Sequence, residues 1–214
     1  MPNELHLKNV VISKDGHDLL NVSASIGAGE VLTLMGPSGS GKSSLLAYIG
    51  GFLSADLAAK GGVDLNGRDV TQIPPHERKI GILFQDSLLF PHMSVGQNLK
   101  FAIPRASKGG ERHTMMQRGL SSVDLDGFED RDPATLSGGQ KARVALVRTL
   151  LAQPHALLLD EPFSKLDTDL RQQVRALVFQ HAKDNGLPTI LVTHDPDDAA
   201  AAGGRIIRLK DGLG

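Results

Sequence analysis

Hydrophobic and polar positions divide the chain into segments of different periodicity. Apolar residues alternate with polar ones over residues 5–12 and 21–26, and this period of two predicts strands with one solvent-facing side. Solid apolar runs are typical of parallel strands buried on both faces, and they cover residues 31–35, 80–84, 156–159 and 189–193. We therefore expect a small antiparallel sheet at the start of the chain and a parallel sheet after it.

Helical patterns lie between the apolar runs, at residues 43–49, 141–152 and 170–182. Strands that alternate with helices predict an α/β core with a parallel sheet. In such a core, ligands gather at the carboxyl ends of the strands, so side chains that follow these strands are the first candidates for a functional site.

A second region begins near residue 87, where the pattern of buried strands disappears. Residues 95–103 and 111–123 predict amphipathic helices, separated by a break rich in Gly, Pro and Lys. A length of 214 residues is enough for one sizeable core. We expect a single domain, 1–214, in which a helical lobe, 87–136, is inserted into a core formed by 1–86 and 137–214.

The composition narrows the range of partners and compartments. Lys and Arg number 23 against 24 Asp and Glu, so the overall charge does not favour nucleic acid or anionic lipid. Cysteine is absent, which excludes disulfides and thiolate zinc sites and fits a reducing compartment. The first ten residues lack a signal-peptide pattern, and no stretch approaches the roughly 18 apolar residues of a membrane span. We expect a cytoplasmic protein that serves a membrane only as a peripheral subunit.

A phosphate-binding loop is predicted by the run Gly36-Pro37-Ser38-Gly39-Ser40-Gly41-Lys42-Ser43, which follows a buried strand and precedes a helix. Glycines let successive backbone N–H groups point at phosphate oxygens, and the helix N-terminus adds a partial positive charge. We expect Lys42 to reach the β- and γ-phosphates and Ser43 to hold Mg²⁺. The alternative is a glycine-rich turn that matches the pattern by chance, but the buried strand before it and the helix after it favour the phosphate-binding loop.

Two adjacent carboxylates, Asp160 and Glu161, end the apolar run at residues 156–159. At this edge of a sheet an aspartate can hold Mg²⁺ through water, and a glutamate can take a proton from an attacking water. An isolated Asp-Glu pair more often only ends a strand, but the phosphate-binding loop in the same sheet favours the catalytic interpretation.

The run Leu136-Ser137-Gly138-Gly139-Gln140 precedes an amphipathic helix. Ser137 is a good N-cap, so simple helix initiation is one interpretation. Each glycine in a first turn costs up to about 1 kcal/mol relative to alanine. What glycine offers there is close approach of the backbone to a ligand, and an anion is the obvious candidate.

These three motifs together resemble the ABC transporter ATPase family, in which they occur in this order and spacing. The similarity covers nearly the whole chain, from Leu5 to about Leu209. It implies an α/β fold of the ABC ATPase type: a P-loop NTPase (RecA-like) core with an N-terminal antiparallel β-subdomain and an inserted α-helical subdomain. It also implies ATP and Mg²⁺ as ligands.

The resemblance also implies roles for individual residues. Mg²⁺ would be held by Ser43, Asp160 and Gln85, and the catalytic residues would be Lys42, Gln85, Glu161 and His194. Read alone, Gln85 would be an ordinary loop residue and His194 a structural histidine. Nucleotide contacts are implied for Gly36, Pro37, Ser38, Gly39, Ser40, Gly41, Lys42, Ser43 and Ser44.

A second copy of the chain is implied to complete each site in a head-to-tail dimer. Its contacts to the nucleotide would come from Ser137, Gly138, Gly139 and Gln140, and Asp167 would lie in a loop that crosses the dimer interface. One departure from the family is that residues 11–17 hold no Phe, Tyr or Trp to stack on the adenine. His17 could substitute, although a solvated turn histidine is the simpler interpretation.

The resemblance extends to importers for thiamine, iron, sulfate, polyamine and maltose through the segment 85–99, and the whole chain resembles the short YnjD-type ATPases of that group. It implies a bacterial importer ATPase at the cytoplasmic face of the inner membrane, with permease subunits and an extracytoplasmic substrate-binding protein as partners. We expect no C-terminal regulatory domain of the maltose type. The alternatives are an exporter ATPase, a non-transport ABC ATPase, or a nucleotide-gated binding module. The apolar set of Leu88, Leu89, Phe90 and Met93 would either receive a permease helix or pack the lobes together.

Overall fold

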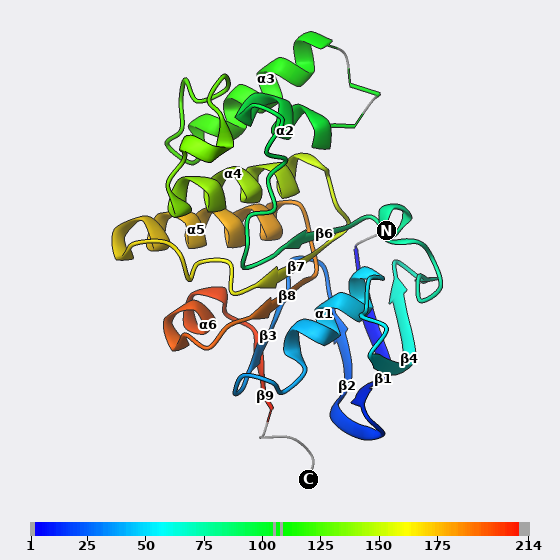
Figure 1. Ribbon diagram of the computed structural model, residues 1–214. Coiled ribbons are helices and arrows are strands. Elements are labelled where there is room, and N and C mark those ends of the chain that lie inside the picture. Colours follow the sequence, from blue (N-terminus) through cyan, green and yellow to red (C-terminus); the bar gives the residue numbers. More distant parts are fainter. Residues whose placement is uncertain (1–2, 105, 108, 210–214) are drawn as a thin grey trace.

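The computed structural model describes residues 3–104, 106–107 and 109–209, and it contains two sheets (Figure 1). The first is antiparallel, with the strand order β2-β1-β4-β5. Its strands are β1 (Leu5–Lys14), β2 (His17–Ile26), β4 (Leu57–Leu65) and β5 (Arg68–Asp69). The inward side chains of β1 and β2 are buried in alternation, as the period of two predicts.

The second sheet is parallel, with the strand order β6-β7-β8-β3-β9. Its strands are β3 (Val31–Met35), β6 (Ile80–Leu83), β7 (Ala156–Asp160), β8 (Thr189–Val192) and β9 (Arg205–Arg208). Leu159 pairs with both Leu83 and Leu191, while Val192 pairs with both Leu34 and Asp160. This register brings the carboxyl ends of β6, β7, β8 and β3 to one level along the same edge.

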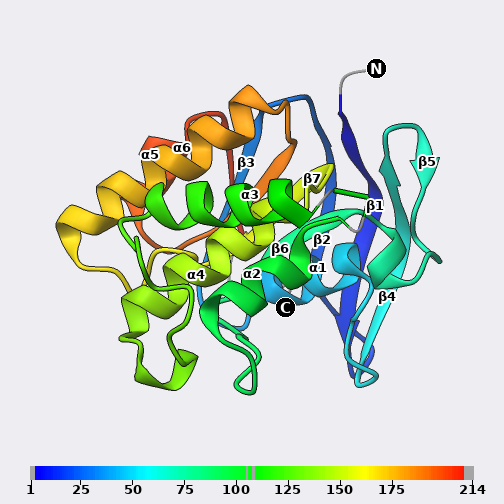
Figure 2. The same cartoon turned by 90° about the horizontal axis from the view of Figure 1, so that it is seen from above.

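Helices cover both faces of the parallel sheet (Figures 1 and 2). Helix α1 (Lys42–Gly50) lies between the two sheets, where Leu45, Leu46 and Ile49 pack into a common core. The opposite face is covered by α4 (Gly138–Leu151) and α5 (Thr168–Asp184). The last helix, α6 (Pro196–Ala202), connects β8 to β9.

A helical lobe stands on α4. It contains α2 (Val95–Ala102) and α3 (Gly109–Ser121). Two short 3₁₀ helices lie elsewhere along the chain: η1 (Pro75–Glu77) precedes β6, and η2 (Pro133–Thr135) precedes α4. Val144 and Val147 of α4 belong to the apolar core of the lobe, whereas Ala145 and Leu146 belong to the core of the parallel sheet. Because α4 is packed into both cores, the boundary after residue 136 stays a prediction.

The predicted α/β fold with an antiparallel β-subdomain and a helical lobe is confirmed. The four apolar runs correspond to strands β3, β6, β7 and β8, but the sequence patterns did not identify strands β4, β5 and β9. Helix α4 also begins at Gly138, three residues earlier than predicted, because the side chain of Ser137 caps it there. Among the described residues, no helix is both long and apolar enough to cross a membrane.

Candidate active site

The loop between β3 and α1 is closed by its own lysine. Lys42 is 8% exposed, and its Nζ donates hydrogen bonds to the carbonyl oxygens of Gly36 (2.8 Å) and Pro37 (2.5 Å) and to Oγ of Ser40 (3.2 Å). Burial lowers the pKa of Lys42, while the carboxylates of two neighbouring acids act in the opposite direction. The ammonium is therefore partly desolvated, and a phosphate that entered the loop would gain more from it than from a lysine in water.

Two glycines give this loop its shape. Gly39 and Gly41 have φ of 85° and 82°, a region that glycine enters without steric cost. A Cβ on Gly41 would lie 2.8 Å from Cδ2 of Leu20, whereas one on Gly39 would meet no described atom within 4 Å. Gly41 is also the N-cap of α1, and within the described chain no side chain caps this helix. The first N–H groups of α1 are thus left for an anion.

Asp160 ends β7 opposite the first turn of α1. Burial raises the pKa of its carboxyl group, and a hydrogen bond with Ser43 lowers it. The hydroxyl of Ser43, the carboxyl of Asp160 and the amide of Gln85 are oxygen donors of the kind that Mg²⁺ accepts. In the described part of the chain, no cluster of three His, Cys, Asp or Glu side chains could hold a metal by itself. This donor set suits Mg²⁺, which protein side chains and substrate phosphates usually hold together.

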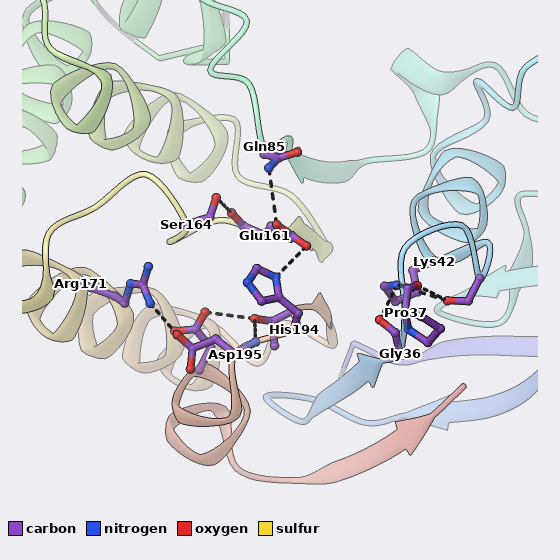
Figure 3. Close-up of polar contacts among 12 residues, drawn as sticks. Gly36, Pro37, Lys42, Gln85, Glu161, Ser164, Arg171, His194 and Asp195 are labelled. Carbon is purple, nitrogen blue, oxygen red and sulfur yellow. Dashed lines mark hydrogen bonds and ion pairs between the residues drawn. The ribbon is translucent and has the colours of Figure 1, made fainter. Parts of the chain in front are cut away.

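Three predicted catalytic side chains meet beyond the ends of β6, β7 and β8 (Figure 3). Oε1 of Glu161 lies 3.0 Å from Nδ1 of His194, and Oε2 accepts a long hydrogen bond from Nε2 of Gln85 (3.5 Å). Glu161 has φ of 45°, which is uncommon for a residue with a side chain, and its N–H donates to the carbonyl of Val192 in β8 (2.9 Å). The neighbouring strand therefore holds the turn that directs Glu161 toward His194.

The N-terminus of α4 carries a complete capping box. Oγ of Ser137 accepts a hydrogen bond from the backbone N–H of Gln140 (3.2 Å), and Oε1 of Gln140 accepts one from the N–H of Ser137 (2.9 Å). Helix initiation therefore explains Ser137 and the side chain of Gln140. It does not explain Gly138, where a Cβ would meet no described atom within 4 Å. This side of the helix is open to a ligand or a second chain.

Gly138 lines a cavity of about 200 Å³ together with Gln85, Asp86 and Lys165. None of the described residues of the phosphate-binding loop lines this cavity. Nζ of Lys165 lies 2.6 Å from Oδ1 of Asp86, so an exposed ion pair joins the loop after β6 to the loop after β7. Asp167, in the same loop, caps α5 by accepting a hydrogen bond from the N–H of Leu170 (3.1 Å).

The segment after Gln85 is held by two side chains that the sequence patterns did not identify. Asn98 is fully buried and binds both the N–H and the carbonyl of Phe90 (2.8 and 3.1 Å). Arg148 donates to the carbonyls of Leu88 (2.9 Å) and Ser87 (3.2 Å). Burial lowers the pKa of the Arg148 guanidinium.

The apolar set predicted in this segment is divided between surface and core. Leu88 is 57% exposed, whereas Leu89 packs against the apolar clusters of both lobes. The ring of Phe90 packs edge-on against that of Phe101, with centroids 5.0 Å apart, and Phe101 is 65% exposed. Leu89 thus fits the packing interpretation, and Leu88 remains available to a partner.

His17 lies at the start of β2, next to the hairpin turn, and is exposed; its Nδ1 is 3.1 Å from the carbonyl oxygen of Asp15. This geometry agrees with a solvated turn histidine. Two further polar residues near the predicted catalytic cluster of Gln85, Glu161 and His194 were not predicted, namely Arg171 and Asp195. Asp195 could have been found, because an aspartate before Pro196 is a typical helix N-cap.

A family model described as "ABC transporter" matches residues 19–164 of the chain. The chain belongs to the ABC transporter family. "Uncharacterized ABC transporter ATP-binding protein YnjD" of Escherichia coli (strain K12) is 48% identical over 198 residues, which cover 92% of this chain and 91% of that protein. "Thiamine import ATP-binding protein ThiQ" of Jannaschia sp. (strain CCS1) is 43% identical over 209 residues, which cover 97% of this chain and 90% of that protein.

Solved structures agree with this family. The "Dimeric structure of a post-hydrolysis state of the ATP-binding cassette MJ0796 bound to ADP and Pi" is 34% identical to the chain, with a TM-score of 0.84 and coverage of 97% of this chain and 95% of that one. The predicted ABC ATPase fold is thereby confirmed. The chain is an ATP-binding subunit of the ABC transporter family, and its activity is that of an ATPase.

Proposed function

We propose that hydrolysis takes place beyond the carboxyl ends of β3, β7 and β8, where Lys42, Asp160, Glu161 and His194 converge. The contact of 3.0 Å between Glu161 and His194 is the observation that carries this proposal, and Lys42 is near enough to Glu161 and Asp160 to interact with their charges. Glu161 orients and deprotonates the attacking water, and His194 holds the γ-phosphate in line. Lys42 and the N–H groups at the start of α1 stabilise the charge on the phosphates.

Mg²⁺ fits the oxygen donors of Ser43, Asp160 and Gln85, and it would supply charge neutralisation at the phosphates. For this role the Asp160 carboxyl must be ionised. Burial raises the pKa of Asp160 and so opposes this charged form, whereas the hydrogen bond with Ser43 and the nearby ammonium of Lys42 favour it.

The site is completed by a second copy of the chain in a head-to-tail dimer. Ser137 and Gly138 are exposed, and the cavity that Gly138 lines includes no residue of the phosphate-binding loop of the same chain. Their open first turn, with its N–H groups and no Cβ at Gly138, suits the phosphates bound by the partner. Asp167 belongs to the loop that crosses this interface, and its cap on α5 keeps that loop in a fixed conformation.

The dimer powers a bacterial importer from the cytoplasmic face of the membrane. This part of the proposal is supported by the similarity to a thiamine import protein over nearly the full length of both chains. Permease subunits and an extracytoplasmic substrate-binding protein are the partners that such a system requires. The exposed Leu88, on a segment fixed by Asn98 and Arg148, suits contact with the permease.

The test is purification of the tagged chain from gently solubilised native membranes, followed by mass spectrometry of what accompanies it. We expect a multi-span permease together with a substrate-binding protein. A permease without a binding protein would favour an exporter. Recovery of only soluble, ribosomal or DNA-bound proteins would contradict the proposed transport role.

A further inference from the structure

A single guanidinium, that of Arg171 on α5, joins the two segments that carry Glu161 and His194. Its Nε donates a hydrogen bond to the carbonyl oxygen of Phe163 (3.1 Å). Its Nη1 donates to Oδ2 of Asp195 (2.5 Å), as Figure 3 shows. Phe163 lies two residues after Glu161, and Asp195 directly follows His194. Arg171 therefore connects the turn after β7 with the turn after β8.

Packing and hydrogen bonds fix the Phe163 end of this connection. Phe163 has no exposed surface, and its ring packs edge-on against Phe179 with centroids 5.9 Å apart. Both the hydroxyl and the N–H of Ser164 donate to the carbonyl oxygen of Glu161 (2.9 and 3.3 Å). The turn from residue 161 to residue 164 is thus closed, and a shift of the Phe163 carbonyl would move Glu161.

A hydrogen-bond network fixes the Asp195 end. The N–H of Asp195 donates to Oγ1 of Thr193 (3.0 Å), and this hydroxyl donates to Oδ2 of Asp198 (3.1 Å). The other oxygen of Asp198 accepts from Nη1 of Arg175, one turn further along α5 (3.0 Å). The turn that bears His194 is therefore braced against α5 at two points.

The chemistry of the side chain matters for this connection. The side chains of Arg171 and Asp195 are only 25% and 23% exposed, so their charge-assisted hydrogen bond is less screened than one on the open surface. A guanidinium holds its donors in a rigid plane, so it can keep two acceptors at a set separation, which an ammonium group cannot do.

We propose that Arg171 is a positioning residue for hydrolysis, which keeps Glu161 and His194 at the separation that their proposed roles require. The inference rests on those roles. Arg171 acts through the carbonyl of Phe163 and the carboxylate of Asp195. A misplacement of about 1 Å in a catalytic group can cost roughly 100-fold in rate. Loss of the guanidinium should therefore lower kcat and leave the affinity for ATP nearly unchanged.

The first test compares Arg171→Met with Arg205→Met in the full-length chain, at saturating Mg²⁺. Arg205 on β9 is the matched control, because its guanidinium also binds a backbone carbonyl, that of Ser25 (3.2 Å), but lies outside the catalytic cluster. We expect Arg171→Met to lower kcat about 10- to 100-fold and to change the KM for ATP by less than about threefold. Equal kcat values for the two variants would overturn the inference.

A double-mutant cycle with His194→Ala separates positioning from a general effect on folding. If Arg171 acts through both catalytic turns, Arg171→Met should lower single-turnover hydrolysis by a smaller factor in the His194→Ala background than in the wild-type background, because only its effect through Glu161 remains. The same fold-loss in both backgrounds would overturn the inference that Arg171 positions His194 relative to Glu161. Asp195→Asn, which keeps an α6 cap but removes the ionic partner, provides a second variant if Arg171→Met does not fold, and it should lower kcat in the same direction. Full activity in His194→Ala itself would instead contradict the proposed function.

Discussion

Oε1 of Glu161 and Nδ1 of His194 lie 3.0 Å apart, although 33 positions separate the two residues in the chain. The contact exists because β7 and β8 are neighbours, with Asp160 paired to Val192. The His194 side chain is 69% exposed, so it can be approached from the solvent side while one nitrogen is held by Glu161. The pairing of β7 with β8 thus brings the two side chains together.

Glu161→Gln should bind ATP but not cleave it, because an amide cannot take the proton of the attacking water. We expect turnover to fall by a factor of about 100 or more. The variant should accumulate as an ATP-dependent dimer, which light scattering detects with saturating ATP and Mg²⁺. A monomer under these conditions would show that the isolated subunit does not dimerise around ATP as proposed.

Lys42→Ala should abolish hydrolysis. The variant loses the charge that faces the phosphates and also the three hydrogen bonds that close the loop onto Gly36, Pro37 and Ser40. We expect binding of a fluorescent ATP analogue to weaken along with turnover. Lys60→Ala, at an exposed position on β4, is the control. Near-normal turnover in Lys42→Ala would contradict the assignment of the phosphate-binding loop.

Gly41→Ala and Gly39→Ala form a matched pair that separates steric clash from backbone strain. Both positions have positive φ, so both variants carry a strain of about 1 kcal/mol. Only the Cβ at position 41 would also lie 2.8 Å from Leu20. We expect Gly41→Ala to lower the free energy of unfolding more than Gly39→Ala, in chemical denaturation of the nucleotide-free protein. Equal losses would contradict the clash.

Asp160→Asn should have opposite effects on stability and activity. Since burial raises the pKa of Asp160, its ionised form destabilises the folded state above that pKa. The neutral amide should therefore raise the Tm of the nucleotide-free protein at neutral pH, and this gain should vanish as the pH falls and Asp160 becomes protonated. Hydrolysis with Mg²⁺ should be lost. Thermal melts in EDTA at neutral and acidic pH measure the change in Tm that the substitution causes. A lower Tm than wild type at neutral pH would contradict the prediction.

Leu88→Ser should uncouple hydrolysis from transport. Its side chain is 57% exposed, so basal ATPase of the isolated subunit should stay within about twofold of wild type. Transport by the assembled complex should fall. Phe90→Ala serves for comparison, because its half-buried ring packs on Phe101 and should cost stability as well. Equal loss of basal and coupled activity in Leu88→Ser would indicate a structural role.

Much of the fold was predictable because its signals are local. The strands β3, β7 and β8 are short apolar runs, and the motifs at residues 36–43 and 136–140 are contiguous. Strand β4 was not predictable, because it owes its conformation to pairing with β1. Its Gly61 lies where a Cβ would be 2.3 Å from the carbonyl oxygen of Asn9, beside an irregularity in the register of β1. No periodicity in either segment indicates such a close approach.

The candidate site could be predicted from local motifs for Lys42 and Glu161, whereas Gln85 and His194 were expected only from the resemblance to the family. The contacts that hold these residues could not be predicted, because they join distant positions. Arg171 and Asp195 are 24 residues apart, and Asn98 and Arg148 are 50 apart. An arginine on an amphipathic helix has the same local pattern whether it faces water or a carboxylate. Only the packing of α5 against the β8 turn distinguishes the two.

Ser137 caps the start of helix α4, and Arg148 lies eleven residues later on the same helix. The guanidinium of Arg148 donates hydrogen bonds to the carbonyls of Ser87 and Leu88. At 1.5 Å per residue Ser137 and Arg148 are about 16 Å apart along one helix axis. Because α4 contributes side chains to the cores of both lobes, we expect it to move as one body. If a permease binds the segment at Leu88 as proposed, a shift of that segment should therefore also displace Ser137.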